Sequence, residues 1–183
     1  MATPTTLPAS FTSGQVLTAA QMNNLRGAFR IMHVVSTAKT DTFTTTNTAY
    51  TEITGLTATI TPRETTSKIL VFVSVDAGSS ADVLLAFRLM RGATAIGIAD
   101  TAGSRTLATM GRYLGTATTG GGTHTSVSNM FLDSPATTSA TTYSVQVFQN
   151  AAGTITINRA STDGDGPGAF RAMSNITLME VSA

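Results

Sequence analysis

The feature that most constrains the fold is a segment at residues 68–76, Lys-Ile-Leu-Val-Phe-Val-Ser-Val-Asp, that is apolar on two faces. Its apolar side chains alternate, with one set made of Ile69, Val71, Val73 and Val75 and the other of Leu70 and Phe72. Successive side chains of a β-strand point to opposite faces, so a strand that is apolar on both has to be covered on both. The segment therefore predicts a central β-strand that is covered on both sides, by a second sheet or by another subunit.

Alternation with a period of two continues from residue 31 to the end of the chain and predicts nine or ten strands. The alternating segments lie at 31–35, 50–54, 56–61, 68–76, 83–91, 95–99, 106–114, 126–132, 142–149, 154–158 and 173–181, with Gly55 separating the second from the third. Turn residues separate them every 8–12 residues or so, which is typical of an antiparallel sandwich or barrel. A Gly/Ser turn at 77–81 predicts a hairpin between its two flanking strands. We therefore expect an all-β, antiparallel jelly-roll-like β-sandwich.

The start of the chain has a different pattern. Residues 1–15 contain Pro4, Pro8 and Gly14 among Thr and Ser, which favours an extended arm. Residues 18–29 predict one short helix, with Thr18 as N-cap and Gln21 completing a capping box. Its apolar residues fall at helical spacing: Met22, Leu25 and Phe29.

The sequence thus predicts two parts, an anchoring arm with a short helix at 1–29 and a β-sandwich knob domain at 30–183. A helix of three turns is marginal alone in water. Its apolar stripe therefore needs a partner, which could be its own sandwich or another protein chain.

The composition excludes several classes of function. Only 11% of residues are charged, against roughly 25% in an average soluble domain. The net charge of +1 gives no field that would attract nucleic acid or an anionic membrane. A chain with so few charges has little colloidal repulsion, so we expect stable oligomers. The absence of cysteine excludes disulfides and thiolate ligands.

The N-terminal residues show no signal peptide, and no apolar run approaches the length that spans a bilayer. We therefore expect a soluble protein, without membrane insertion, that is made in a cytoplasm.

No motif predicts chemistry. His33 lies in an alternating strand and His124 in a Gly/Thr-rich loop, and neither has a partner at the spacing of a metal site or a catalytic triad. We expect His33 to be a hydrogen-bonded strand residue and His124 a loop surface residue, although three copies of either could meet on the axis of a trimer.

Two acidic patterns are also weak. Asp163 and Asp165 resemble a fragment of a calcium loop but lack the third acidic position and the terminal glutamate. A pair of carboxylates could in principle form a glycosidase, but the chain has no Trp and only three Tyr to bind sugar. We therefore expect no catalytic residues, no metal and no cofactor, and we expect that the protein is not an enzyme.

Several segments resemble proteins of tailed-bacteriophage virions. Residues 14–25, Gly-Gln-Val-Leu-Thr-Ala-Ala-Gln-Met-Asn-Asn-Leu, resemble an opening that is common near the N-terminus of such proteins. Residues 67–71, 89–97, 131–145 and 174–180 are similar to a β-sandwich module of phage tail, fibre-tip and head-decoration proteins, including those of marine and cyanobacterial phages. The resemblance implies a homotrimeric, non-enzymatic structural protein of the virion, with a jelly-roll-like body.

The long repeats of a fibre shaft are missing, which favours a capsid decoration, or cement, protein on the head surface, with the major capsid protein as its partner. The residues predicted to anchor it to the capsid or to sister subunits, or else to fill its own core, are Phe11, Val16, Leu17, Met22, Leu25 and Phe29. The alternative is a receptor-binding knob at the tail or tail-fibre tip, whose loops at 116–125 and 163–168 would contact host surface glycans. A tail adaptor or collar protein is a third possibility.

Overall fold

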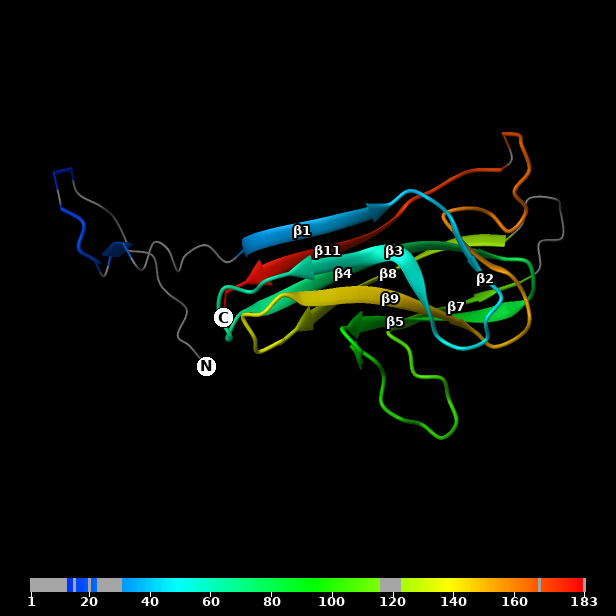
Figure 1. The fold of residues 1–183 in the computed structure, drawn as a ribbon, viewed down its shortest axis with the longest axis horizontal. Helices are drawn as coiled ribbons and strands as arrows, with labels where there is room; N and C mark the ends of the chain where they lie inside the picture. The colour runs from blue at the N-terminus through cyan, green and yellow to red at the C-terminus, as the bar shows by residue number, and fades with distance from the viewer. Residues whose placement is uncertain are drawn as a thin grey trace.

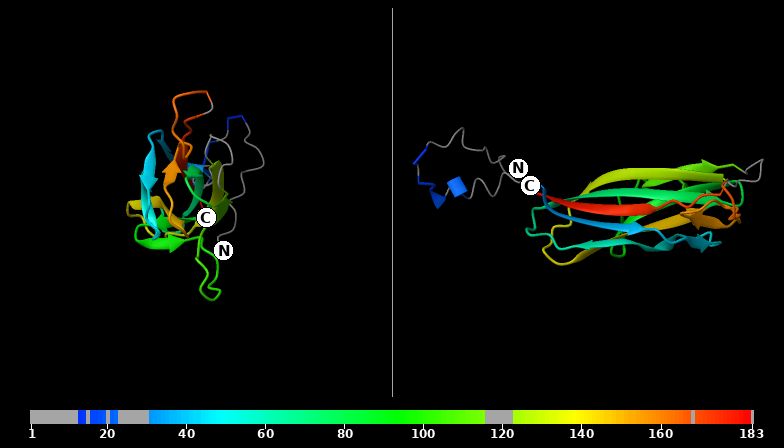
Figure 2. Two further views of the ribbon diagram at one scale, coloured as in Figure 1. Left: turned by 90° about the vertical axis from the view of Figure 1, so that its right-hand side faces the viewer. Right: turned by 90° about the horizontal axis from the view of Figure 1, so that it is seen from above.

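The computed structural model describes residues 13–14, 16–19, 21–22, 31–115, 123–167 and 169–182. In these residues the regular elements are strands that run along the long axis of the molecule (Figures 1 and 2). The strands are β1 (Ile31–Lys39), β2 (Phe43–Thr45), β3 (Thr51–Ile60), β4 (Lys68–Ser79), β5 (Val83–Arg91), β6 (Thr94–Ile96), β7 (Met110–Leu114), β8 (Thr123–Asp133), β9 (Thr141–Gln149), β10 (Ile155–Ile157) and β11 (Ser174–Val181).

The strands form two antiparallel sheets. In sheet A the order is β1-β11-β4-β8, and the short strands β10 and β2 extend it beside the far end of β4. In sheet B the order is β3-β9-β5, with β6 and β7 pairing with different parts of β5. The long strands β3, β4 and β5 lie in sheets B, A and B in turn, and β8, β9 and β11 lie in sheets A, B and A. This alternation is the jelly-roll arrangement of a β-sandwich, as the sequence predicts.

Strand β4 is the centre of sheet A, as its two-sided apolar pattern predicts. It pairs with β11 and β10 on one side and with β8 on the other. The face predicted from alternation is the one that fills the core: Ile69, Val71, Val73 and Val75 are each at most 3% exposed. They share the core with residues of sheet B, among them Phe87, Val145 and Val147. Sheet B therefore covers one face of β4.

The predicted hairpin between 68–76 and 83–91 is wrong, because β4 and β5 lie in different sheets. The first three residues of the Gly/Ser segment that suggested a turn, 77–79, belong instead to β4. A Cβ added to Gly78 would lie 2.7 Å from the carbonyl oxygen of Thr123 and 2.7 Å from Oγ1 of Thr156. Glycine is needed at this position for close approach of neighbouring strands, and the chain then crosses to sheet B through residues 80–82.

The predicted helix is only partly within the described residues. Positions 19, 21 and 22 have helical backbone, and the capping box is present: the Thr18 N–H donates to Gln21 Oε1 at 2.9 Å, and the Gln21 N–H donates to Thr18 Oγ1 at 3.2 Å. The predicted helical positions 23–29, like residues 1–12 of the predicted arm, lie outside the described residues.

The strand register defines two ends of the sandwich. Ile31, the first residue of β1, pairs with Val181 of β11, which pairs with Lys68 at the start of β4. We call this end the arm pole, because the N-terminal segment joins the sandwich there. Ser79, at the other end of β4, pairs with Thr123 and Ile155, and we call that end the distal pole.

Candidate interaction surfaces

The outer face of sheet A carries a group of apolar side chains on four adjacent strands. Leu70 of β4 pairs with Leu132 of β8 and with Met179 of β11, which in turn pairs with Val34 of β1. In the next row Phe72 pairs with Met130. Directly paired residues share a face of a sheet, so these side chains form one surface, which we call the apolar belt: Val34, Leu70, Phe72, Met130, Leu132 and Met179.

The belt is exposed in the isolated chain. Met130 is 60% exposed, Leu132 53%, Val34 51% and Phe72 38%, while Leu70 and Met179 are partly buried by their neighbours. Burial of a large apolar side chain stabilises by about 1.5–3 kcal/mol, and a contiguous apolar patch on a protein surface usually marks an interaction site. The belt is therefore the second apolar face of β4, for which the sequence predicts a cover.

Sheet B is different, because the chain itself covers the middle of its outer face, although Leu84 and its strand partner Tyr113 are exposed at the edge. Ala86 and Met90 point away from the core on β5, yet they are only 3% and 5% exposed. The same face carries Arg88, whose guanidinium lies 4.0 Å from the centre of the Tyr50 ring. The Tyr50 hydroxyl donates to the carbonyl oxygen of Leu107 at 2.6 Å. The pKa of Tyr50 is raised by burial, against the opposing charge of Arg88.

The residues predicted as anchors in the arm are not brought together into one described site. Val16 is 87% exposed, Met22 48% and Leu17 38%. None of these three residues belongs to the described core of the sandwich, and their role as anchors stays a prediction. Phe11, Leu25 and Phe29 lie outside the described residues.

A polar cluster at the distal pole joins strands that the sequence does not place together. Asp76 of β4 contacts Nε2 of His124 through one carboxylate oxygen and accepts a hydrogen bond from Ser126 Oγ at 2.9 Å through the other. The His124 ring also meets Phe170 edge-on, with ring centres 4.4 Å apart. The prediction that His124 is a loop surface residue is wrong, since it lies in β8 and its side chain is 15% exposed.

The geometry of this cluster does not make a nucleophile. In a serine nucleophile's site the imidazole lies between the hydroxyl and the carboxylate, whereas here the carboxylate lies between the imidazole and the hydroxyl. The sequence pattern could not reveal the contact, because Asp76 and His124 are 48 residues apart and meet only through the β4–β8 pairing.

The cluster continues into the core through buried hydrogen bonds. The Asp76 N–H donates to Ser174 Oγ at 3.0 Å, and the Ser174 hydroxyl donates to Asn158 Oδ1 at 2.6 Å. The Asn158 amide nitrogen donates to the carbonyl oxygens of Lys39 and Asp41 at 2.7 and 2.8 Å. This network holds the ends of β1, β4, β10 and β11 together and therefore fixes the shape of the distal pole.

A second buried group connects the two sheets toward the arm pole. Asp133 of β8 accepts a hydrogen bond from the Tyr143 hydroxyl of β9 at 2.7 Å, and Nη1 of Arg91 of β5 lies 2.9 Å from both of its carboxylate oxygens. Burial, together with the hydrogen bond and charge of Asp133, raises the pKa of Tyr143. Each polar group in this cluster has a partner, which makes it a structural link between the sheets.

The remaining candidates from the sequence are surface residues. His33 is an exposed residue of β1. Asp163, in the sequence that resembles a calcium loop, binds Arg171 at 2.8 Å and Arg159 at 3.5 Å, so two guanidinium groups already balance its charge. Within the part of the chain that the structure describes, no three His, Cys, Asp or Glu side chains are grouped as metal ligands would be.

Among the described residues, no helix has the length and hydrophobicity that crossing a membrane requires.

The belt residues of β8 and β11 are the part of the candidate site that the sequence pattern missed. A signal was present in β8, where Met130 and Leu132 alternate with the inward-facing Phe131 and make the strand apolar on both faces. The same two-sided pattern identifies β4.

The fold places the chain among jelly-roll β-sandwich proteins. No protein-family model matches the chain, and no curated protein matches it. Among solved structures it is similar to a chain in "Structure of infectious bursal disease virus Gx strain", with a TM-score of 0.36 and 14% identity over 84% of this chain. The match covers 39% of that viral chain, and at this TM-score the likeness is too low to transfer a function.

Proposed function

We propose that the protein is a structural component of a tailed-phage virion, a homotrimeric decoration protein that binds the capsid through its N-terminal arms. The observation that carries the proposal is the exposed apolar side chains of Val16, Leu17 and Met22, on a segment that precedes a jelly-roll body. The motif at residues 14–25 resembles the opening of phage virion proteins, and jelly rolls are common in viral capsids.

The proposed mechanism depends on the division between arm and knob. The arm joins the sandwich at Ile31, beside Val181 at the arm pole, so the distal pole would face away from the shell. Three arms on one trimer would bind several capsid subunits at once, and multivalency makes weak single contacts collectively strong. With a net charge of +1, the binding would depend on apolar burial, and we expect it to persist in high salt.

The direct test is removal of residues 1–29. We expect the truncated protein to keep its β-sheet circular dichroism and the mass of the full-length oligomer, but to lose binding to phage heads that lack the protein in a co-sedimentation assay. Full-length protein is the matched control and should bind in both 0.1 M and 1 M NaCl. Undiminished binding by the truncated protein would contradict the proposed role of the arm.

One observation favours the alternative, a receptor-binding knob. His124 and Phe170 are in contact, so the segments around the two loops predicted to touch host glycans lie together at the distal pole. Jelly rolls are also found in lectins. In this alternative the protein without residues 1–29 would still compete with phage for adsorption to host cells, whereas a decoration protein would not compete. The same truncated protein therefore distinguishes the two functions.

A further inference from the structure

We propose that the apolar belt on the outer face of sheet A is the surface through which copies of this chain pack against one another, in a cyclic oligomer whose axis runs along the strands. This inference deepens the homo-oligomer part of the proposed function. It assigns the second cover of β4 to a sister subunit, and it leaves the arms free for a different partner.

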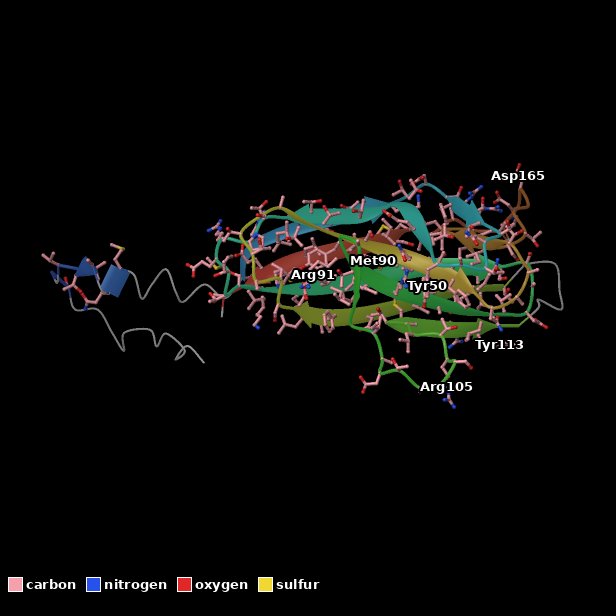
Figure 3. The ribbon with its side chains drawn as sticks, turned by 60° about the horizontal axis from the view of Figure 1, so that its bottom comes forward. Tyr50, Met90, Arg91, Arg105, Tyr113 and Asp165 are labelled. Atoms are coloured by element: carbon pink, nitrogen blue, oxygen red, sulfur yellow. The ribbon has the colours of Figure 1, made fainter. Side chains whose placement is uncertain are left out.

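The two sheets show why the interface belongs to sheet A. On sheet B the outward side chains Ala86 and Met90 are nearly completely buried by the same chain, and Arg88 is held between Tyr50 and Gln146, to which its Nε donates at 2.7 Å. Among the described residues, the exposed apolar side chains of that outer face are the single pair Leu84 and Tyr113, against four in the belt. Beyond that sheet projects the loop that carries Arg105 (Figure 3). On sheet A, by contrast, four of the six outward-facing belt side chains are 38–60% exposed.

The charge of the belt favours a second copy as the occupant. None of its six side chains is ionisable. On the neighbouring strands, the row of Phe72 and Met130 ends in Thr177 and Ser36, whose hydroxyl groups form a hydrogen bond of 2.8 Å. At the arm-pole border Lys68 donates to Ser134 Oγ at 2.7 Å. A face without charge offers no pattern for an oppositely charged partner to match, whereas it is compatible with another copy of itself.

The outer face of sheet A, of which the belt forms the two middle rows, approaches the size of such an interface. Between the pairs Ile31–Val181 and Ala38–Asn175 it spans four strands and eight residues of β1. At about 4.8 Å between strands and about 3.4 Å per residue, this is a projected area of about 500 Å². The relief of the side chains raises the accessible area above that value, toward the roughly 800 Å² per partner of a standard protein interface.

The direction of the strands connects this interface with the arms. Every copy in a cyclic oligomer with its axis along the strands has its arm pole at the same end. Since Ile31 and Val181 lie at that pole, all arms would leave from one end of the oligomer, where they could bind one shell together. A two-fold axis perpendicular to the strands would instead place the arms of the two copies at opposite ends.

The test compares the same substitution on the two sheets of the full-length chain. Leu132→Glu and Met130→Glu place a carboxylate in the belt, while Leu84→Glu places it on the outer face of sheet B at a residue that is 40% exposed. In sedimentation velocity we expect both belt variants to become monomers, with association at least about 100-fold weaker, and Leu84→Glu to keep the wild-type mass. Oligomeric belt variants with native circular dichroism would overturn the inference.

Cross-linking gives a second test that does not depend on a charged variant folding. The chain has no cysteine, so Met130→Cys and Leu84→Cys each introduce a single thiol. A short bismaleimide should join two chains of Met130→Cys and none of Leu84→Cys; the reverse result would overturn the inference.

Particle binding separates this inference from the proposed function. Loss of head binding by Leu132→Glu without a change in mass would assign the belt to the capsid and overturn the inference. Belt variants that become monomers would support the inference even if the wild-type protein bound no phage heads, which would contradict only the proposed function.

Discussion

At the scale of single residues, Tyr143 is the clearest source of pH dependence. Its hydroxyl is buried and donates to Asp133. Burial is the main cause that raises the pKa of Tyr143 above its usual value, and the hydrogen bond to Asp133 and the negative charge of Asp133 add to it. Below about pH 10, the ordinary pKa of tyrosine, the group is neutral in both the folded and the unfolded chain. Above that pH the tyrosine ionises first in the unfolded chain. The contribution of Tyr143 to the stability of the folded chain is therefore lost as pH rises.

We therefore predict that Tyr143→Phe lowers the free energy of unfolding by about 1 kcal/mol at neutral pH, because Asp133 loses one hydrogen bond. The variant should also lose less stability than wild type between about pH 9 and 11. Urea unfolding across this range measures both effects. Tyr113→Phe, at a residue 64% exposed, is the control and should keep the wild-type slope. If the free energy of unfolding fell with pH as steeply in Tyr143→Phe as in wild type, Tyr143 would not be the source of the pH dependence.

The buried polar residues also mark the limit of prediction from sequence. Asn158 has a positive φ of 63° and joins Lys39, Asp41 and Ser174, which are up to 119 positions away from it. Local spacing carries no information about such contacts, because strand pairing creates them. The same reason explains the wrong prediction for His124, whose partner Asp76 is set by the β4–β8 register.

At the scale of elements, Gly78 shows why one prediction succeeded and another did not. The central strand was predictable because Ile69 to Val75 are apolar on both faces except at Ser74, and the core set is at most 3% exposed. The predicted hairpin after it was wrong because glycine has two roles, in turns and in close strand contacts. The second role depends on Thr123 and Thr156, which the local sequence does not reveal.

We predict that Gly78→Ala destabilises the sandwich by about 1–3 kcal/mol, because the added methyl group would overlap a backbone oxygen that has little room to move. Gly164→Ala is the matched control, since nothing lies within 4 Å of its added Cβ and its φ is not positive. Thermal unfolding of both variants measures the difference. Equal melting temperatures would show that β4 and its neighbours can separate at this point without cost.

At the scale of the whole molecule, the strand pattern predicted the jelly-roll sandwich, but it did not show which outer face stays exposed. That difference depends on residues from separate strands, such as Tyr50 across sheet B and the row from Val34 to Leu132 across sheet A. The arm's capping box was predictable because Thr18 and Gln21 are three positions apart. The anchoring role of the arm remains a prediction.

The central claim is that this chain functions by being buried against copies of itself and against a larger particle. The most direct measurement is the mass of the purified full-length protein by sedimentation equilibrium at micromolar concentration. The account predicts three times the 18.9 kDa mass of one chain, unchanged in 1 M NaCl because the interface is apolar. A stable monomer of 18.9 kDa at every concentration would contradict it.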